Sequence, residues 1–388
     1  MTVTTTTTKT TMTLQRKSHG RRWIGAAALT FVLVATPMVW ANFAASEVIA
    51  DGLNNPRGLN FGPNGALYVA EAGSGGDGAC QQGPEGLRCF GETGSVTRIN
   101  LRTGSTDRLA TGLPSLASPD GSFATGPHDI ALQGLGNISV TIGYGGDPTN
   151  RVASLGAAGA YFARLARMTA NGKWSLQEDL GAYETAANPN GDEVDSNPYS
   201  ILSINGNKRV YTDAGANALN EIAANGKIKT LATFPNRLVS APPLPPGVSV
   251  PMDAVPTTVT VGPDGAYYVG QLTGFPFPVG GANIYRVPAD GGTPTVYAAN
   301  LTGIIDIAFG ADGSLYVLEI AKNGLLAAFG GNDWTGALIK VGADGTRTEL
   351  VPGQLTAPGG IAVGEDGYLY VTNNSIYSGE GQVLRIAP

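Results

Sequence analysis

Charged side chains are scarce in this chain of 388 residues: Asp, Glu, Lys and Arg make up 14% of it, and the formal net charge is −6. Beyond Arg22 the lysines and arginines are dispersed and form no cluster. A nucleic-acid-binding surface needs such a cluster to neutralise phosphates, so the composition excludes nucleic acid as a partner. Hydrophobic residues reach 42%, which is enough to bury a core and excludes general disorder.

Cysteine is rarer still, with two residues in the whole chain. Cys80 and Cys89 flank a short Gly-containing segment, and in an oxidising compartment this spacing predicts a structural disulfide. Closing so short a loop contributes roughly 2–3 kcal/mol in the chain-entropy description. A metal site is the alternative, but two cysteines without a neighbouring histidine make a poor one.

The first 41 residues have the pattern of an export signal. Arg16, Lys17, Arg21 and Arg22 precede an apolar run, and Val39 and Ala41 supply small residues at the −3 and −1 positions of a cleavage site. We therefore predict a signal peptide over residues 1–41 and a secreted or periplasmic mature protein with no membrane span. An uncleaved anchor is the alternative, although the run contains Pro37 and has no basic stop after it.

An internal repeat organises the rest of the sequence. Each copy consists of an alternating strand, a tight turn and a second strand rich in Tyr and Val, followed by a second hairpin. Asn64-Gly65 and Asp264-Gly265 are examples of turns that supply the positive φ that a hairpin needs. The copies begin at Pro56, Pro127, Pro198, Pro256, Ile304 and Pro358.

The last copy lacks its fourth strand, because the chain ends after the third. The segment SEVIADGL, which begins at Ser46, has the missing pattern. An N-terminal strand that completes the last sheet closes a propeller without leaving an edge. The sequence thus predicts an all-β protein, a single six-bladed β-propeller over residues 46–388 with four strands per blade.

The long segments between these strands are unevenly placed. They follow second strands or connect blades, and because strand direction alternates, both kinds emerge on one face of the ring, which we call the long-loop face. Function concentrates on loops held by a rigid scaffold, so this face is the predicted site. The segments are 72–95, 143–161, 181–197, 235–255, 271–282 and 320–335.

Two sets of positions are expected to surround the channel at that face. The innermost strands begin with Arg57, His128, Tyr199, Thr257, Ile305 and Gly359, and the next positions place Asp129 and Asp306 three blades apart, across the channel from each other. The second strands end with Glu71, Gly143, Asp213, Gln271, Glu319 and Asn373. These side chains could bind a cation, a polyol or water, or they could satisfy loop backbone groups.

His128 is the only histidine beyond the predicted signal peptide, and with Asp129 and Asp306 it forms the candidate catalytic set. Its functional roles would be proton shuttle or metal ligand, and the alternative is a structural histidine. Adjacent strand residues point to opposite faces, so His128 and Asp129 should not pair with each other. Arg57 and Tyr199 are the more plausible neighbours of His128, and together with Glu71, Asp213 and Glu319 they are the predicted ligand-binding residues.

The amino-acid sequences of the repeats resemble those of the ScyD/ScyE family of exported, NHL-like propellers, which is named from gene neighbourhoods for the sunscreen pigment scytonemin. The segments GDEVDSNPYS and GFPFPVGGA carry the resemblance, which spans the mature chain. It implies an exported propeller but no catalytic residue, and it does not assign the pigment as a ligand.

The blade pattern is more distantly similar to gluconolactonase and paraoxonase propellers and to pyrroloquinoline-quinone sugar dehydrogenases. The first resemblance raises calcium as a cofactor, but the innermost strand starts are a poor calcium set. The second resemblance implies that His128 could correspond to the catalytic histidine that these dehydrogenases have near the channel mouth. This sequence, however, shows no cluster of Arg and Lys to hold the quinone. We therefore expect a small molecule or a protein partner to bind on the long-loop face; the alternative is an enzyme there, either a metal-dependent lactonase-like hydrolase or a quinone-dependent sugar dehydrogenase.

Overall fold

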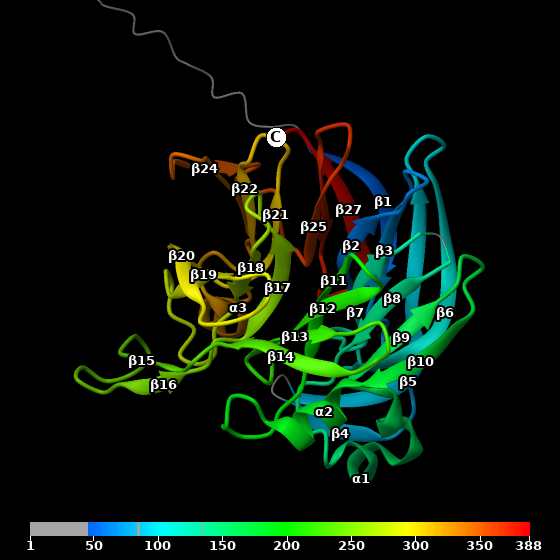
Figure 1. Cartoon of the computed structure of the whole chain (residues 1–388), viewed down its shortest axis with the longest axis horizontal. Helices are drawn as coiled ribbons and strands as arrows, with labels where there is room; N and C mark the ends of the chain where they lie inside the picture. The colour runs from blue at the N-terminus through cyan, green and yellow to red at the C-terminus, as the bar shows by residue number, and fades with distance from the viewer. Residues whose placement is uncertain (1–45, 84–85, 135) are drawn as a thin grey trace, which may run out of the picture. The chain divides into compact units, whose positions relative to one another are not determined.

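The computed structural model describes residues 46–83, 86–134 and 136–388, which fall in one compact unit of the chain. The predicted signal peptide, residues 1–41, lies outside them. The described residues form six sheets of antiparallel strands arranged as blades, so the predicted six-bladed β-propeller is confirmed (Figure 1).

Each blade runs from its innermost to its outermost strand in the order in which the chain visits them, except the last. Blades 1 to 3 consist of β2 (Pro56–Phe61), β3 (Leu67–Glu71), β5 (Gly86–Asn100) and β6 (Ser105–Ala117); β7 (Pro127–Leu132), β8 (Ile138–Ile142), β9 (Arg164–Met168) and β10 (Trp174–Asp179); and β11 (Pro198–Ile204), β12 (Lys208–Asp213), β13 (Ala218–Ile222) and β14 (Ile228–Thr233).

Blades 4 to 6 consist of β17 (Pro256–Val261), β18 (Tyr267–Gln271), β19 (Ala282–Val287) and β20 (Thr295–Leu301); β21 (Ile304–Phe309), β22 (Leu315–Glu319), β23 (Ala337–Val341) and β24 (Arg347–Leu350); and β25 (Gly360–Val363), β26 (Leu369–Asn373), β27 (Ser378–Ile386) and β1 (Ser46–Asn54).

The ring closes in two ways. The innermost strands contact one another in the order β2, β7, β11, β17, β21, β25, and β25 returns to β2. On the outside of blade 6, β1 pairs antiparallel with β27, with Ser46 opposite Ile386. The N-terminal strand therefore covers the edge that the C-terminal strand would otherwise expose, as the sequence predicted.

The hydrophobic core lies between neighbouring blades. Tyr68 of blade 1 packs in one cluster with Ile130 and Val140 of blade 2, and similar clusters join the other blades. Successive side chains of a strand point to opposite faces of its sheet, and each face packs against a neighbouring blade. All five residues of the second strand β22 are therefore buried. Burial at both sheet faces makes the strands rigid supports for the loops that connect them.

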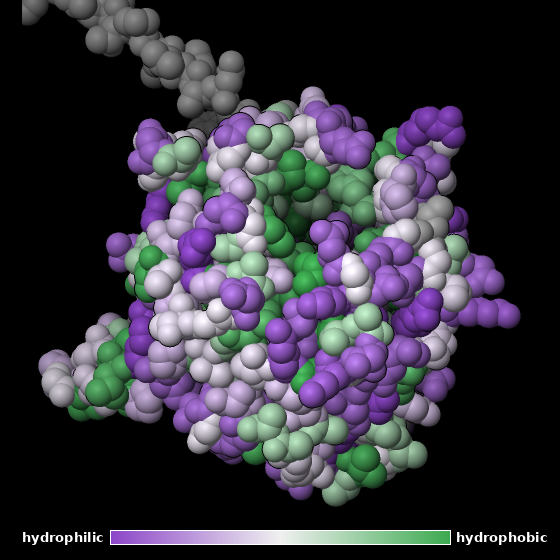
Figure 2. Space-filling view, in the orientation of Figure 1, coloured by the Kyte–Doolittle hydropathy of each residue, from purple (hydrophilic) through white to green (hydrophobic). Residues whose placement is uncertain are grey.

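The long segments carry additional elements. These are β4 (Cys80–Gly83), α1 (Arg151–Leu155), a 3-10 helix (Gly156–Tyr161), α2 (Leu180–Ala187), β15 (Arg237–Val239), β16 (Val250–Met252) and α3 (Leu325–Gly331). The β15–β16 hairpin projects away from the blades (Figure 1), and Leu238 on it is 77% exposed. On the face shown in Figure 2, hydrophobic residues form small groups among polar ones. None of the helices in the described part of the chain is long and apolar enough to cross a membrane.

Candidate functional site

A cavity of about 1040 Å³ opens where the long segments surround the central channel. We call it the channel-mouth cavity. Its lining combines starts of innermost strands, among them Arg57, His128 and Tyr199, with residues from the long segments of several blades. The prediction that Arg57, His128 and Tyr199 lie together is therefore confirmed. The lining has three parts: a basic base, an aromatic wall and an acidic wall.

Arg57 forms the centre of the basic base. It is the second residue of β2, its side chain is 9% exposed, and one of its Nη atoms donates a 2.7 Å hydrogen bond to the Ala124 carbonyl oxygen. Its Nε has no hydrogen-bond partner among the described residues, and no carboxylate of that part of the chain lies within 4 Å. The positively charged Arg57 side chain is therefore held at the cavity by one hydrogen bond to a backbone carbonyl.

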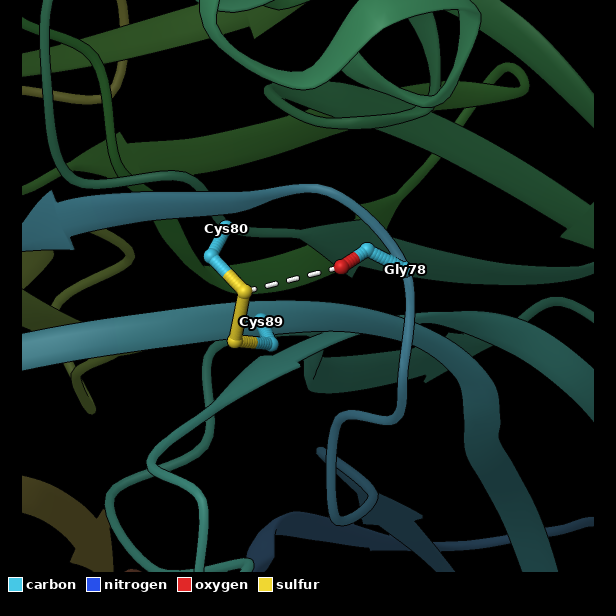
Figure 3. Close-up of a disulfide and its surroundings, with 3 residues drawn as sticks. All are labelled: Gly78, Cys80 and Cys89. Carbon is cyan, nitrogen blue, oxygen red and sulfur yellow. Dashed lines mark hydrogen bonds between the residues drawn. A yellow bond between two sulfur atoms is a disulfide. The ribbon is translucent and has the colours of Figure 1, made fainter.

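Arg88 is the second cation of the basic base, and it comes from the β4–β5 hairpin. Its side chain, 3% exposed, donates to the Thr125 hydroxyl at 3.0 Å and to the Gly145 carbonyl at 3.3 Å. Cys89, next to it, forms the predicted disulfide with Cys80, its cross-strand partner in this hairpin (Figure 3). The Cys80 sulfur lies 3.5 Å from the Gly78 carbonyl oxygen. The disulfide thus fixes the strand segment that carries Arg88.

His128 and Tyr199 complete the basic base. Their rings pack with centroids 4.5 Å apart, and His128 Nδ1 lies 3.1 Å from the Pro198 carbonyl. A carbonyl can only accept, so Nδ1 carries the proton and Nε2 is left as an acceptor. Burial, together with the charges of Arg57 and Arg88, lowers the pKa of His128 to about 3. The imidazole is therefore neutral in the physiological range.

The Tyr199 hydroxyl is an unpaired polar group in the same place. Within the described chain it has no hydrogen-bond partner, although the residue is only 9% exposed. Burial raises the pKa of Tyr199, and the Arg57 charge partly offsets this effect. The hydroxyl consequently stays protonated and is available as a donor.

The aromatic wall lies beside Arg57. The Phe123 ring centroid is 5.6 Å from that of Trp334 and 6.1 Å from that of Phe329, and the last two are 5.1 Å apart. Phe329 belongs to α3 and is 50% exposed, whereas Trp334 is buried. Phe123 follows β6 and directly precedes Ala124, the residue that Arg57 contacts. The basic base and the aromatic wall are therefore continuous.

The acidic wall consists of Asp192, Glu193, Asp195 and Asp253, with several asparagines among them. Burial, followed by the charges of neighbouring acids, raises the pKa of both Asp195 and Asp253. Asn236 donates to Asp192 at 3.3 Å. The cavity is thus basic at its base and acidic along one side.

Asp129 and Asp306 lie deeper, in the channel itself. They line a space of about 10 Å³ together with Ser200 and Thr257, so the two carboxylates, from blades 2 and 5, lie together in the channel as predicted. Burial, followed by the Asp306 charge, raises the pKa of Asp129 to about 7. No hydrogen bond joins His128 to Asp129 among the described residues, as strand alternation predicted. His128 also lines this small space, so the three residues of the candidate catalytic set lie together there, and His128 alone of them also lines the channel-mouth cavity.

The three acids at the ends of second strands do not line the channel-mouth cavity. Glu71 accepts from Ser95, from Arg108 and from the Asn54 backbone. Asp213 accepts from Ser196 and the Asn197 amide, and Glu319 accepts from the Thr302 amide. These carboxylates satisfy the backbone and side chains of neighbouring loops, which is the structural role that the sequence left open beside ligand binding.

Calcium does not fit the residues at the innermost strand starts. The six positions carry a guanidinium, a neutral imidazole, a phenol, one threonine hydroxyl, an isoleucine and a glycine, so they offer no carboxylate, and Arg57 would repel a cation. Among the described residues, no group of three or more His, Cys, Asp or Glu side chains is placed to hold a metal ion.

Arg88, Phe123 and Phe329 line the cavity although the sequence did not single them out as site residues. Arg88 directly precedes Cys89, a residue that the disulfide already explained, and the scarcity of charged residues in the chain was the only sequence signal that could have indicated this arginine. Phe123 lies in an irregular segment and Phe329 in the short helix α3 of an insertion, so no strand period indicates the direction of either side chain.

No family model and no curated protein matches the chain. Among solved structures, it is similar to a gluconolactonase from Xanthomonas campestris, with a TM-score of 0.51, 9% identity, and coverage of 88% of this chain and 90% of that one. A virginiamycin B lyase from Staphylococcus aureus gives a TM-score of 0.48 at 15% identity, covering 89% and 99% of the two chains. A calcium-binding regucalcin from Agrobacterium tumefaciens gives a TM-score of 0.48 at 15% identity, covering 88% and 93%. At such identities the likeness shows the propeller fold alone.

Proposed function

We propose that this protein is an exported β-propeller that binds a small molecule in the channel-mouth cavity, and that it belongs with the ScyD/ScyE family that its repeats resemble. The cavity carries the proposal. Its volume of about 1040 Å³ suits a small organic ligand, and its lining combines aromatic rings with a few converging polar groups, as ligand sites do. The long segments that form it rest on buried strands, which favours a pocket that exists before the ligand arrives.

A small molecule is favoured over a protein partner by the same geometry. Arg57, His128 and Tyr199 lie at the base of a concave space, out of reach of a flat protein surface. Export is supported by the disulfide, which persists in oxidising compartments.

The two enzyme alternatives have less support. A calcium-dependent hydrolase lacks suitable ligands at the innermost strand starts, as described above. A quinone-dependent dehydrogenase gains Arg57 and Arg88 beside His128, but the acidic wall would repel the further carboxylates of that cofactor. The calcium-dependent hydrolase gives no reason for the aromatic wall, whereas a planar quinone could pack on it, so the acidic wall is the observation that disfavours the quinone.

A library of small metabolites, screened by thermal shift and then by tryptophan fluorescence, tests the proposal. Trp334 lines the cavity, whereas Trp174 lies on β10 outside the lining. A compound that binds in the cavity should raise the melting temperature and change the fluorescence of the protein. The change should disappear in Trp334→Phe and persist in Trp174→Phe. The proposal fails if no compound stabilises the protein, or if the change follows Trp174.

A further inference from the structure

The buried arginines at the base of the cavity have a different environment from the other buried arginine of the fold. Arg151, 8% exposed, forms an ion pair with Asp179 at 2.5 Å. Arg57 and Arg88 are similarly buried but have no carboxylate within 4 Å in the described chain. Burying a cation without a counter-charge is costly, so such a pair is retained where an anion completes it.

Three donors of the basic base lack partners. Arg57 Nε, Arg88 Nε and the Tyr199 hydroxyl make no hydrogen bond within the described residues, and all three side chains line the cavity. Both guanidinium groups line the cavity together with His128. Guanidinium groups present paired N–H donors that match the two oxygens of a carboxylate, and charge-assisted hydrogen bonds of this kind are strong.

The aromatic wall specifies what the anion is attached to. Arg57 contacts Ala124, and Phe123, the preceding residue, packs against Trp334 and Phe329. A group held by Arg57 therefore has aromatic side chains beside it, on which a planar ring can pack. The acidic wall on another side disfavours a second anionic group, so the ligand carries its negative charge at one end.

We propose that the channel-mouth cavity is specific for planar aromatic monocarboxylates, with the carboxylate at Arg57, Arg88 and Tyr199 and the ring against Phe123, Phe329 and Trp334. This inference rests on the proposed function, because it names the class of ligand for the same cavity. It adds a charge requirement that the proposed function does not contain.

The test compares 2-naphthoate with 2-naphthamide, which has the same ring and nearly the same shape without the charge. Calorimetric titration of the purified protein should give an affinity for the carboxylate at least about tenfold higher than for the amide. Arg57→Gln and Arg88→Gln should each lower the affinity for 2-naphthoate by about tenfold or more and leave the affinity for 2-naphthamide unchanged. Trp334→Leu should weaken both compounds, because it removes part of the ring contact.

Arg347 provides the matched control. It also donates to backbone carbonyls, those of Ala299 and Asn300, but it does not line the cavity, so Arg347→Gln should bind 2-naphthoate as the wild type does. The melting temperatures of Arg57→Gln and Arg88→Gln show whether the variants are folded. We expect little loss for Arg57→Gln, because the substitution removes a buried charge that has no carboxylate partner and, besides that charge, only the hydrogen bond to Ala124.

The outcomes separate the two proposals. Equal binding of the carboxylate and the amide, or unchanged binding by Arg57→Gln, would overturn the charge requirement while the cavity remained a binding site. Absence of 2-naphthoate binding would also overturn it, even if the metabolite screen found other ligands. A screen that yields no ligand at all, or a fluorescence change that is lost in Trp174→Phe instead of Trp334→Phe, overturns the proposed function together with this inference.

Discussion

At the scale of single residues, Asp129 and Asp306 occupy equivalent positions and join their own blades to the next. Asp129 accepts from the amides of Ile130 and Ile201, at 2.7 and 2.8 Å, and from the Ser200 hydroxyl. Asp306 accepts from the Ile307 and Ile361 amides, both at 2.8 Å, and from Thr258. Each carboxylate thus satisfies backbone groups of two blades, which explains an acid at this place without any catalytic role.

Replacing Asp129 by alanine should destabilise the fold by about 2–4 kcal/mol, because buried donors would be left unsatisfied. Asp129→Asn keeps an acceptor oxygen and should cost less. Urea unfolding at constant pH measures both effects. Asp290→Ala, at an exposed turn position, is the control and should be neutral. Wild-type stability of Asp129→Ala would show that these hydrogen bonds do not hold the blades together.

His128 should remain neutral over the whole physiological range. Its pKa, lowered to about 3 by burial and by the charges of Arg57 and Arg88, places protonation below the stability range of most proteins. The imidazole resonances in a proton NMR titration from pH 8 to pH 5 should therefore stay constant. The chain contains one other histidine, His19, so assignment by His128→Gln is direct. A midpoint near pH 6.5 would contradict the packing described here.

At the scale of elements, the β4–β5 hairpin connects a structural feature to the site. The Cys80–Cys89 bond lies within it, Gln81 accepts from the Tyr144 hydroxyl of the neighbouring blade at 3.1 Å, and Arg88 reaches the cavity. The hairpin is thus fixed at one end by a covalent bond and in its middle by a hydrogen bond. The position of Arg88 depends on both.

Removing the disulfide should have two effects. Cys80→Ser with Cys89→Ser should reduce stability by roughly 2–3 kcal/mol, by the loop-closure argument. The double variant should also lower the affinity for 2-naphthoate about as much as Arg88→Gln does, because the disulfide no longer fixes the position of Arg88. Titration of the double serine variant below its melting temperature measures the second effect. Unchanged affinity would show that the Gln81 contact and the strand pairing suffice to hold Arg88.

The elements also show how far the sequence could be interpreted. The strands follow from the alternation of apolar and polar residues with a period of two. Their order, and the closing role of β1, follow from the repeat of the four-strand unit, so the sequence predicted these as well. The meeting of Arg57, His128 and Tyr199 followed from equivalent positions in adjacent blades. Arg88, Phe123 and Phe329 could not be placed in this way, because their positions depend on contacts between insertions that have no repeat. The fold is therefore more predictable than the site that it supports.

At the scale of the whole molecule, buried carboxyl groups couple stability to pH. Burial raises the pKa of Asp129 and Glu319 to about 7 and that of Asp213 and Asp306 to about 6. In the unfolded chain these groups ionise near pH 4, so unfolding releases protons between that pH and the raised values. Their contribution is complete below pH 4 and is lost as the pH rises through 6 to 7. His128 acts in the opposite direction but only below its unfolded pKa of about 6.5.

Stability should therefore decrease between pH 5.5 and pH 8, and Glu319→Gln isolates one contribution. Glu319 accepts from the Thr302 amide through one oxygen, and a glutamine carbonyl can replace that acceptor. The pKa of Glu319 is raised from 4.5 to about 7, so the stability of Glu319→Gln relative to wild type should increase with pH, by on the order of 1–3 kcal/mol between pH 4.5 and pH 8. Urea unfolding across this range measures the difference, with Glu47→Gln, exposed on β1, as the control. Parallel curves for Glu319→Gln and wild type would mean that Glu319 is ionised in the folded protein, and that the interior of the ring tolerates the charge.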